Sequence, residues 1–274
     1  MGTVTLTPTV SVVIATRDRP ADLARCLSGL YHVDRRLLVE VVIADDGSRR
    51  PVAAGLAATP LPVRVLRVER SIGADAIRNL AARDAEGDHL AFLDDDAVCR
   101  SDWLTVIADQ LSSDVAVTGR VLRFDEGLVS RARQTRYDDR YRGLLPADRV
   151  RYFAGGNGAV RADAFHASGG FDPRAAGGDN TLAHRLTASG GSVRFRPDMV
   201  VAHRNSKGFC CAARAATLAG RATEAPPPAW TLLQSALRPA SSGDPAVRAL
   251  NTLLGLCHIA GQLLSRSERG VDDH

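Results

Sequence analysis

Apolar and polar residues along the first hundred positions form blocks that predict buried strands followed by helices. Apolar runs at 10–15, 39–44, 63–68 and 89–93, the first three rich in β-branched residues, are typical of strands in the interior of a parallel sheet. Pro20 suits the first turn of a predicted helix to about Leu30, and a second helix is predicted from about Asp75 to Ala85. Strands that alternate with helices at this spacing indicate βαβ units.

The second half of the chain has weaker patterns. We predict helices at 103–111, 163–168 and 181–189, a longer strand or strand pair at 115–124, and strand-like segments at 193–195 and 199–202. Residues 130–142 are rich in Arg, Tyr and Asp without periodicity, which predicts a loop or mobile flap. The glycine cluster at 155–158 allows a sharp turn or a close approach of the backbone to a ligand.

The C-terminal segment, which follows the prolines at 226–228, has the pattern of an amphipathic helix. Its polar stripe consists of Arg248, Asn251, Gly255, His258 and Gln262, and apolar residues cover the other positions. We expect the wide apolar face to be buried, either on the rest of the chain or across a homodimer. Contact with a membrane surface is the alternative, although the stripe carries few basic residues.

Two predicted strands end in clustered acidic residues. The run Leu90–Leu93 is followed by Asp94, Asp95 and Asp96, and the strand at 39–44 is followed by Asp45 and Asp46. Open α/β sheets bind ligands at the carboxyl ends of their strands, where such carboxylates repel one another unless a cation relieves them. Asp94 and Asp96 could therefore hold Mg²⁺ or Mn²⁺. A solvated acidic turn is the alternative.

Composition narrows the class of protein further. The 274 residues are 45% hydrophobic and 24% charged, as expected of a globular protein with one large domain or two closely packed ones. The net charge of +4 is too small to predict nucleic-acid binding. Five cysteines without metal-ligand spacing favour a reducing, cytoplasmic compartment. We find no signal-peptide pattern at the N-terminus and no apolar run long enough to span a membrane.

Several motifs occur in an order that resembles family 2 glycosyltransferases with the GT-A fold, over residues 10–205. They are Ser-Val-Val-Ile-Ala-Thr at 11–16, Val-Ile-Ala-Asp-Asp-Gly-Ser at 42–48, Gly-Ala-Asp-Ala-Ile-Arg-Asn at 73–79, Phe-Leu-Asp-Asp-Asp at 92–96, Asp-Trp-Leu at 102–104, Gly-Gly-Asn-Gly-Ala-Val-Arg at 155–161, Gly-Gly-Phe-Asp at 169–172 and Gly-Asp-Asn-Thr-Leu-Ala-His-Arg-Leu at 178–186.

The resemblance implies roles for individual residues on the donor side. Asp45 matches the contact to the nucleobase, with Thr16 beside that pocket, and Arg78 matches a residue that touches base or diphosphate. Asp94 and Asp96 match the ends of the DXD motif, with Asp96 as the direct metal ligand. Asp95, in the middle of that motif, suits a contact to a sugar hydroxyl.

Further along the chain, Asp179 matches the general base and His203 matches a histidine near the metal and diphosphate. Gly156 and Asn157 are expected to line the acceptor site, for which a structural turn is the alternative. For Asp179 the alternative is a structural role, in which its side chain simply caps a helix.

Two positions depart from the family pattern. Gly178 stands where the family usually has the Glu of a Glu-Asp pair, which removes an acceptor contact or an electrostatic partner of Asp179. Arg17-Asp18 replaces the usual Tyr-Asn, and Arg17 could stack on a base or meet a phosphate. The segment at 130–142 could close over the donor or contact an acidic acceptor, and a solvated loop is the alternative.

The sequence therefore predicts an α/β protein of the GT-A type, with a mostly parallel, Rossmann-like sheet flanked by helices and a helical C-terminal extension. The predicted catalytic domain covers 1–205, with a nucleotide-sugar half at 10–100 and an acceptor half at 101–205, and the extension covers 206–274. The expected activity is inverting transfer of a sugar from a nucleotide-diphosphate donor to a hydroxyl of a small molecule, glycan or lipid-linked acceptor, with Mg²⁺ or Mn²⁺. The expected location is the cytoplasm, with peripheral membrane association open.

Two other functions remain open at this point. The changes at Gly178 and Arg17 suit a catalytically impaired relative that binds a nucleotide sugar or a partner protein. A sugar-phosphate nucleotidyltransferase would share the general architecture. The chain lacks the glycine-rich, basic loop after the first strand that such an enzyme would need.

Overall fold

The computed structural model describes residues 8–56, 59–175, 178–205, 208–221 and 243–271. These residues form two compact units. The first unit takes its described residues from 1–121, 144–173 and 178–203, and the second takes them from 122–143, 174–175 and 204–274. The domain boundaries expected from the sequence stay a prediction.

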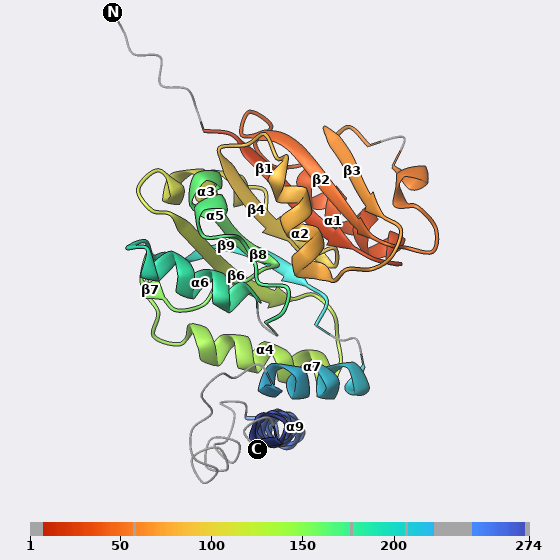
Figure 1. Cartoon of the computed structure of the whole chain (residues 1–274), viewed down its shortest axis with the longest axis vertical. Coiled ribbons are helices and arrows are strands. Elements are labelled where there is room, and N and C mark those ends of the chain that lie inside the picture. Colours follow the sequence, from red (N-terminus) through yellow and green to blue (C-terminus); the bar gives the residue numbers. More distant parts are fainter. Residues whose placement is uncertain (1–7, 57–58, 176–177, 206–207, 222–242, 272–274) are drawn as a thin grey trace, which may run out of the picture. The chain divides into compact units, whose positions relative to one another are not determined.

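The first unit contains a nine-stranded sheet and most of the helices (Figure 1). In chain order its elements are β1 Val10–Thr16, α1 Pro20–Leu30, β2 Leu38–Asp46, the 3₁₀ helix Val52–Gly55, β3 Val63–Val68, α2 Ala74–Arg83, β4 His89–Leu93, β5 Ala97–Cys99, α3 Trp103–Leu111, β6 Ala116–Arg123, β7 Arg149–Val150, β8 Asn157–Arg161, α5 Ala162–Ala167, α6 Gly178–Ala188 and β9 Val193–His203. The last two residues of β6 belong to the second unit.

The strand order is β3-β2-β1-β4-β8-β6-β9-β5, and β7 pairs with β9. β3, β2, β1 and β4 are parallel to one another, while β8 joins β4 antiparallel and β5 joins β9 antiparallel. Helix α2 packs on β1 and β2, and α3 packs on β9 and β4 (Figure 1). The four parallel strands therefore bring their carboxyl ends, with Thr16, Asp45 and Asp94, to one edge of the sheet.

An aromatic cluster anchors β4 just before its acidic end. The Phe92 ring lies 4.8 Å from that of Phe171 and 5.3 Å from that of Phe165, and Phe153 meets Phe92 edge-on at 6.2 Å. Phe92, Phe153 and Phe171 are fully buried. Aromatic contacts of this kind stabilise beyond their buried area, so the strand end that carries Asp94 is held rigidly.

A buried glutamate connects three parallel strands. The Glu40 carboxylate on β2 accepts hydrogen bonds from Ser11 Oγ on β1 at 2.8 Å, from Arg64 Nε on β3 at 2.9 Å and from the Glu86 N–H at 2.8 Å. Burial alone would raise the pKa of Glu40, but these hydrogen bonds outweigh it and lower the pKa. Glu40 therefore contributes stability above the pKa of an unfolded glutamate, and this contribution is lost as the pH falls through the lowered folded-state pKa.

We expect Glu40→Gln to lower the free energy of unfolding by about 2 kcal/mol at neutral pH, because a buried charge-assisted network is left incomplete. Chemical denaturation at neutral and acid pH measures this effect. The deficit should shrink at acid pH, where wild-type Glu40 is itself protonated. An equal deficit at both pH values would contradict the assigned charge, and Glu86→Gln, which leaves the Glu86 N–H in place, is the control.

Several expected elements were wrong in type or extent. Residues 130–142 are not a loop but most of helix α4, Leu128–Tyr141. Its stability comes from Ala132, which is buried, from the stacked rings of Tyr137 and Tyr141, and from residues with good helix propensity rather than from a regular apolar stripe. Residues 193–203 form one strand through Pro197, because the β7 and β5 ladders pair with β9 on either side of that proline.

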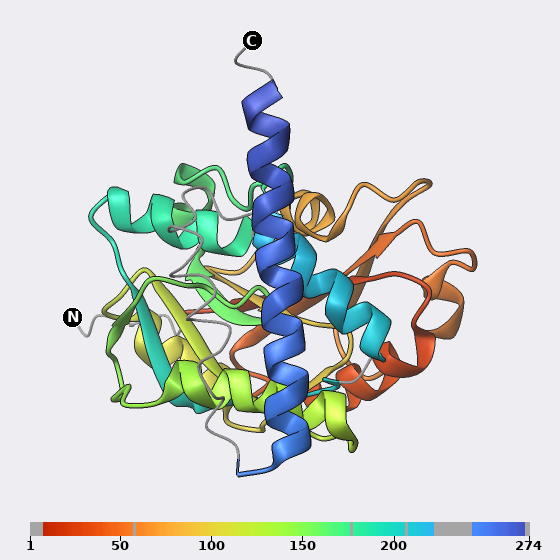
Figure 2. The same cartoon turned by 90° about the horizontal axis from the view of Figure 1, so that it is seen from below.

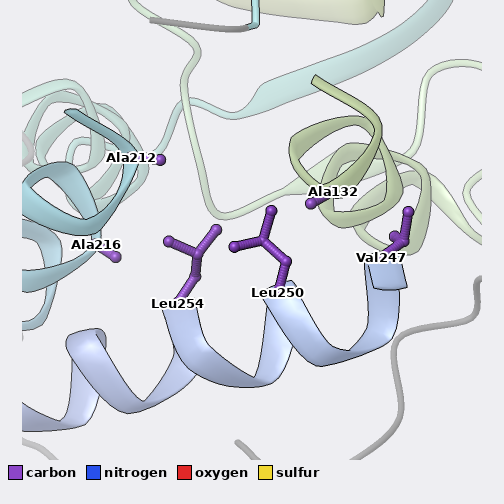
Figure 3. Packing of buried hydrophobic residues seen from close by; sticks show 6 residues of the cluster. All are labelled: Ala132, Ala212, Ala216, Val247, Leu250 and Leu254. Carbon is purple, nitrogen blue, oxygen red and sulfur yellow. The ribbon is translucent and has the colours of Figure 1, made fainter. Parts of the chain in front are cut away.

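The second unit is helical and comprises α4, α7 Phe209–Arg221 and α9 Pro245–Val271. Its core joins all three helices through small and branched residues (Figure 3), namely Ala132, Ala212, Ala216, Val247, Leu250 and Leu254. Figure 2 shows the long α9 crossing α7. Gly220 and Gly261 permit this close crossing, since a Cβ at either position would lie within 2.0 Å of a carbonyl oxygen of the other helix.

This crossing corrects the expected burial of the C-terminal helix. Part of the polar stripe faces α7, since Gln262 is 3% exposed and His258 Nδ1 lies 3.3 Å from the Ala216 carbonyl oxygen. Part of the apolar face is exposed instead, at Leu253, Leu256, Leu263 and Leu264. Gly261 is the reason, because it lets α7 approach the helix on its polar side.

Candidate active site

Two carboxylates and one imidazole meet where β4 ends. Asp94 and Asp96 follow β4, and His203 is the last residue of β9. The antiparallel register of β5 with β9 pairs Ala97 with His203, which places the histidine beside the preceding Asp96. His203 Nε2 lies 3.0 Å from Asp96 Oδ1 and 3.7 Å from Asp94 Oδ2.

This donor set fits a divalent cation. One potential ligand atom from each of Asp94, Asp96 and His203 lies within 4.8 Å of the others. Asp96 and His203 are buried, and Asp94 is partly exposed, so the cluster has one open side. Carboxylate oxygens with a single imidazole suit Mn²⁺ or Mg²⁺ better than a thiolate-preferring metal. The structure thus brings together the three residues expected to bind metal.

Arg78 lies beside this cluster. Its Nη2 donates to Asp94 Oδ1 at 2.6 Å, and its Nη1 donates to Asp75 Oδ1 at 3.3 Å. Arg78 Nε is buried and has no hydrogen-bond partner among the described residues. The guanidinium therefore holds one carboxylate of the cluster in place and keeps a positive charge next to it, as a diphosphate site needs. Its contact with a ligand stays a prediction.

Gly156 allows Asp94 its position. A Cβ on Gly156 would lie 2.0 Å from Asp94 Oδ2 and 2.3 Å from its Cγ, whereas a Cβ on the neighbouring Gly155 would meet Arg78 and Asp179 at an ordinary 3.6 Å. The absence of a side chain at Gly156 thus makes room for Asp94 of the acidic cluster. The expected contact of Gly156 with the acceptor stays a prediction.

We expect Gly156→Ala to weaken Mn²⁺ binding at least about tenfold, because Asp94 must move and outer-shell displacements of this kind cost about 10–100-fold. Isothermal titration with Mn²⁺ gives the affinity. Gly155→Ala is the matched control and should bind Mn²⁺ like the wild type. Equal affinities for the two variants would contradict the placement of Asp94 in the metal site.

Asp95 has hydrogen-bond partners of its own outside the metal cluster. It is 3% exposed and accepts hydrogen bonds from Thr16 Oγ1 at 2.8 Å and from Arg19 Nη1 at 3.0 Å. Burial is the main reason that the pKa of Asp95 is raised, while Arg19 and Thr16 oppose the shift. Thr16 and Asp95 are therefore hydrogen-bonded to each other, and their expected contacts with the substrate stay predictions. Arg19, which the sequence analysis missed, lies 3.9 Å from Asp96.

Asp45 is fully buried, and its carboxylate accepts hydrogen bonds from the N–H groups of Ser48 and Val52 and from Arg67 Nη1 at 2.6 Å. Burial would raise the pKa of Asp45, but these bonds lower it. In the structure Asp45 braces the 48–52 loop, and its contact with a nucleobase stays a prediction. Arg17 follows β1 and is exposed.

Asp46, which the sequence analysis did not single out for a site, has a similar bracing role. It accepts hydrogen bonds from Ser71 Oγ at 2.6 Å and from the N–H groups of Ile72 and Gly73. These bonds hold the loop that leads into α2, the helix that carries Arg78.

The side chain of Asn157 has its hydrogen-bond partners inside the protein, and its expected place at the acceptor site stays a prediction. Its side chain is fully buried, and its amide donates to the carbonyl oxygens of Arg120 and Met199 while its Oδ1 accepts from Trp103 Nε1 at 2.8 Å. Both amide hydrogens are therefore used inside the protein. We assign Asn157 the structural role of joining β8 to β6, β9 and α3.

Asp179 is the second residue of α6 and is partly exposed. Its Oδ1 accepts the Asn180 N–H at 2.9 Å. Its Cβ and Arg78 Nη1 both lie 3.6 Å from the point where a Cβ of Gly155 would stand. Asp179 and Arg78 thus flank the same glycine, which puts the expected base next to the residue that contacts Asp94.

Comparisons with known proteins give the family of the chain. Residues 11–169 match the model of Glycosyl transferase family 2, which is more than half of the chain. The chain therefore belongs to glycosyl transferase family 2, rather than to the nucleotidyltransferases considered above. Pre-mycofactocin glycosyltransferase of Mycobacterium tuberculosis is 28% identical over 204 residues, which cover 71% of this chain and 42% of that protein. The O-antigen biosynthesis protein RfbC of Myxococcus xanthus is 31% identical over 130 residues, which are 46% of this chain and 10% of that protein.

Solved structures confirm the GT-A fold. The mannosyltransferase PcManGT from Pyrobaculum calidifontis, in complex with GDP-Man and Mn²⁺, gives a TM-score of 0.63 at 19% identity and covers 97% of this chain and 74% of its own. GalNAc-T7 with UDP, GalNAc and Mn²⁺ gives 0.60 at 19% identity, over 88% of this chain and 47% of its own. The chain spans less than half the length of the curated relatives named above. Among the described helices, none is long and apolar enough to cross a membrane.

Proposed function

We propose that the protein transfers a sugar from a nucleoside-diphosphate sugar to an acceptor hydroxyl, with inversion at the anomeric carbon and with a divalent cation. The observation that carries this proposal is the cluster of Asp94, Asp96 and His203, with Arg78 bonded to Asp94 and Asp179 nearby. The GDP-Man and Mn²⁺ named for PcManGT, and the UDP, GalNAc and Mn²⁺ named for GalNAc-T7, support it.

The transfer forms one bond and breaks one. The acceptor oxygen attacks the anomeric carbon, and the bond from that carbon to the diphosphate oxygen breaks, so that the nucleoside diphosphate leaves with the electron pair. Asp179 takes the proton of the acceptor hydroxyl, a general-base contribution of about 10²–10⁴-fold. Attack opposite the leaving group by a single displacement inverts the configuration.

Asp94, Asp96 and His203 would hold the cation, which supplies charge neutralisation for the leaving diphosphate when bound. Arg78 adds a fixed positive charge beside these residues and keeps Asp94 oriented. Such preorganised charges stabilise the transition state because they need no rearrangement during the reaction. Mn²⁺ is our first choice of metal because of the imidazole.

Product analysis tests the transfer directly. UDP-, GDP- and dTDP-linked α-sugars are incubated with the protein and Mn²⁺ in the presence of simple alkyl glycosides as hydroxyl acceptors, and released nucleotide and product are followed by NMR. We expect β-configured products, or β-configured free sugar where water is the acceptor. Retention of the α configuration would contradict the single displacement.

A binding protein without turnover is the second candidate, and Gly178 favours it. Glycine at this position provides no carboxylate of its own beside Asp179. Metal-dependent binding of a nucleotide sugar without any nucleotide release from it would support this candidate over the enzyme.

We further propose that α9 pairs with a second copy of the chain. Ala249, Leu253, Leu256, Ala260 and Leu263 are all exposed, and their alternating spacings of four and three residues match the seam of a coiled coil. We expect light scattering to give a dimer for the wild type and a monomer for Leu256→Glu. Leu218→Glu, at a similarly exposed leucine of α7, is the control. A monomeric wild type that binds lipid vesicles would favour the membrane alternative instead.

A further inference from the structure

Gly178, the residue before Asp179 in the chain, lies against a carboxylate of another helix, α2. Gly178 is buried, and a Cβ at this position would lie 2.5 Å from Oδ2 of Asp75 and 2.6 Å from the carbonyl oxygen of Asp172. The usual glutamate of the family therefore does not fit at this position. Where its side chain would begin, the structure has the carboxylate of Asp75.

Asp75 is fixed and accessible at the same time. It lies in the first turn of α2, where a negative charge is favourable, and its Oδ1 accepts a hydrogen bond from Arg78 Nη1 at 3.3 Å. Its side chain is 24% exposed, in contrast to the fully buried Asp45. Through Arg78, Asp75 is connected to Asp94 of the acidic cluster. A polar group of a substrate can therefore reach Asp75 without breaking the core.

We propose that Asp75 is a positioning residue for the acceptor, which supplies from α2 the second carboxylate that Gly178 lacks. Its Oδ2 accepts a hydrogen bond from the acceptor and so orients the reacting hydroxyl toward Asp179. The inference rests on the proposed function, because it requires Asp179 to be the base. It also means that the departure at Gly178 is compensated within this chain.

The electrostatics of the pair agree with this arrangement. Burial raises the pKa of Asp75, the charges of Asp179 and Asp94 raise it further, and Arg78 opposes the shift. The charge of Asp179 acts on Asp75, so the two carboxylates lie close enough to repel each other. A neutral residue at position 75 removes this repulsion, so we expect activity to persist to a lower pH.

The experiment compares Asp75→Asn with the wild type in hydrolysis of whichever sugar nucleotide the protein binds, with water as the acceptor and Mn²⁺ present. We expect the rate to fall about tenfold at neutral pH, the acid limb of the pH–rate profile to move to lower pH, and Mn²⁺-dependent nucleotide affinity to stay within about twofold. Asp75→Glu retains the charge and should keep the acid limb near its wild-type position. Asp84→Asn, at the other end of α2, is the control for folding and should behave like the wild type.

Three results would overturn the inference. An unchanged rate and pH profile in Asp75→Asn would show that Asp75 does not act on the acceptor. A loss of nucleotide affinity in that variant would show that Asp75 only supports Arg78 on the donor side. A wild-type protein that neither binds nor hydrolyses any sugar nucleotide would overturn the proposed function itself, and this inference with it.

Discussion

Asp179→Asn should lower the turnover of sugar nucleotide by about 10²–10⁴-fold, the size of a general-base contribution. Asparagine has nearly the same shape and can still accept the Asn180 N–H at its Oδ1, so the start of α6 should stay intact. Its amide cannot take a proton from the acceptor hydroxyl. Binding of the nucleotide in the presence of Mn²⁺ should be unchanged, because Asp179 is not among the three residues of the acidic cluster.

Steady-state kinetics and calorimetry on the same preparations check this prediction. Asp163→Asn is the matched control, since Asp163 is an acid in the first turn of another helix, α5. Full turnover in Asp179→Asn would remove Asp179 from the base role. Loss of nucleotide affinity would mean that it acts on the donor instead.

Asp96→Ala should abolish the stabilisation of the protein by Mn²⁺. A cation that binds only the folded state stabilises it by about 2.7 kcal/mol at a concentration of 100 times its dissociation constant, which raises the melting temperature by several degrees. Asp96 and His203 Nε2 are 3.0 Å apart, so the substitution removes a central member of the cluster. Without metal the variant should melt no lower than the wild type, because one of the two repelling carboxylates of the cluster is gone.

Thermal melts with and without Mn²⁺ measure the difference, and Glu126→Ala, at an exposed acid, is the control. An equal gain from Mn²⁺ in the wild type and in Asp96→Ala would contradict the metal site. A variant that melts well below the wild type without metal would mean that Asp96 is a structural acid.

Most strands and helices up to α3 were predictable because their signals are local. β3, β4 and α3 have the predicted ends, since each is bounded by turn residues or by charges that interrupt an apolar run. Helix α4 was missed because its stability depends on contacts of a few residues such as Ala132 within the second unit, rather than on periodicity. The sequence alone cannot show such tertiary contacts.

Within the candidate site, the acids at strand ends were predictable and their partners were not. The approach of His203 to Asp96 depends on the short strand β5 and its register with β9, which spacing along the chain does not reveal. Arg19 and Asp75 become visible only when their contacts with Asp95 and Arg78 are seen. The internal contacts of Asn157 were not predictable, because its motif gave no sign that two carbonyl oxygens and an indole N–H surround its amide.

Calorimetric titration of UDP, GDP and dTDP, each with and without Mn²⁺, against the wild type and Asp96→Ala tests the central claim most directly. We expect one nucleotide to bind the wild type in the presence of Mn²⁺, and the binding to be lost both without the metal and in Asp96→Ala. This result would identify the class of donor. No binding of any of the three nucleotides to the folded wild-type protein would contradict the donor site proposed at Asp94, Asp96 and His203.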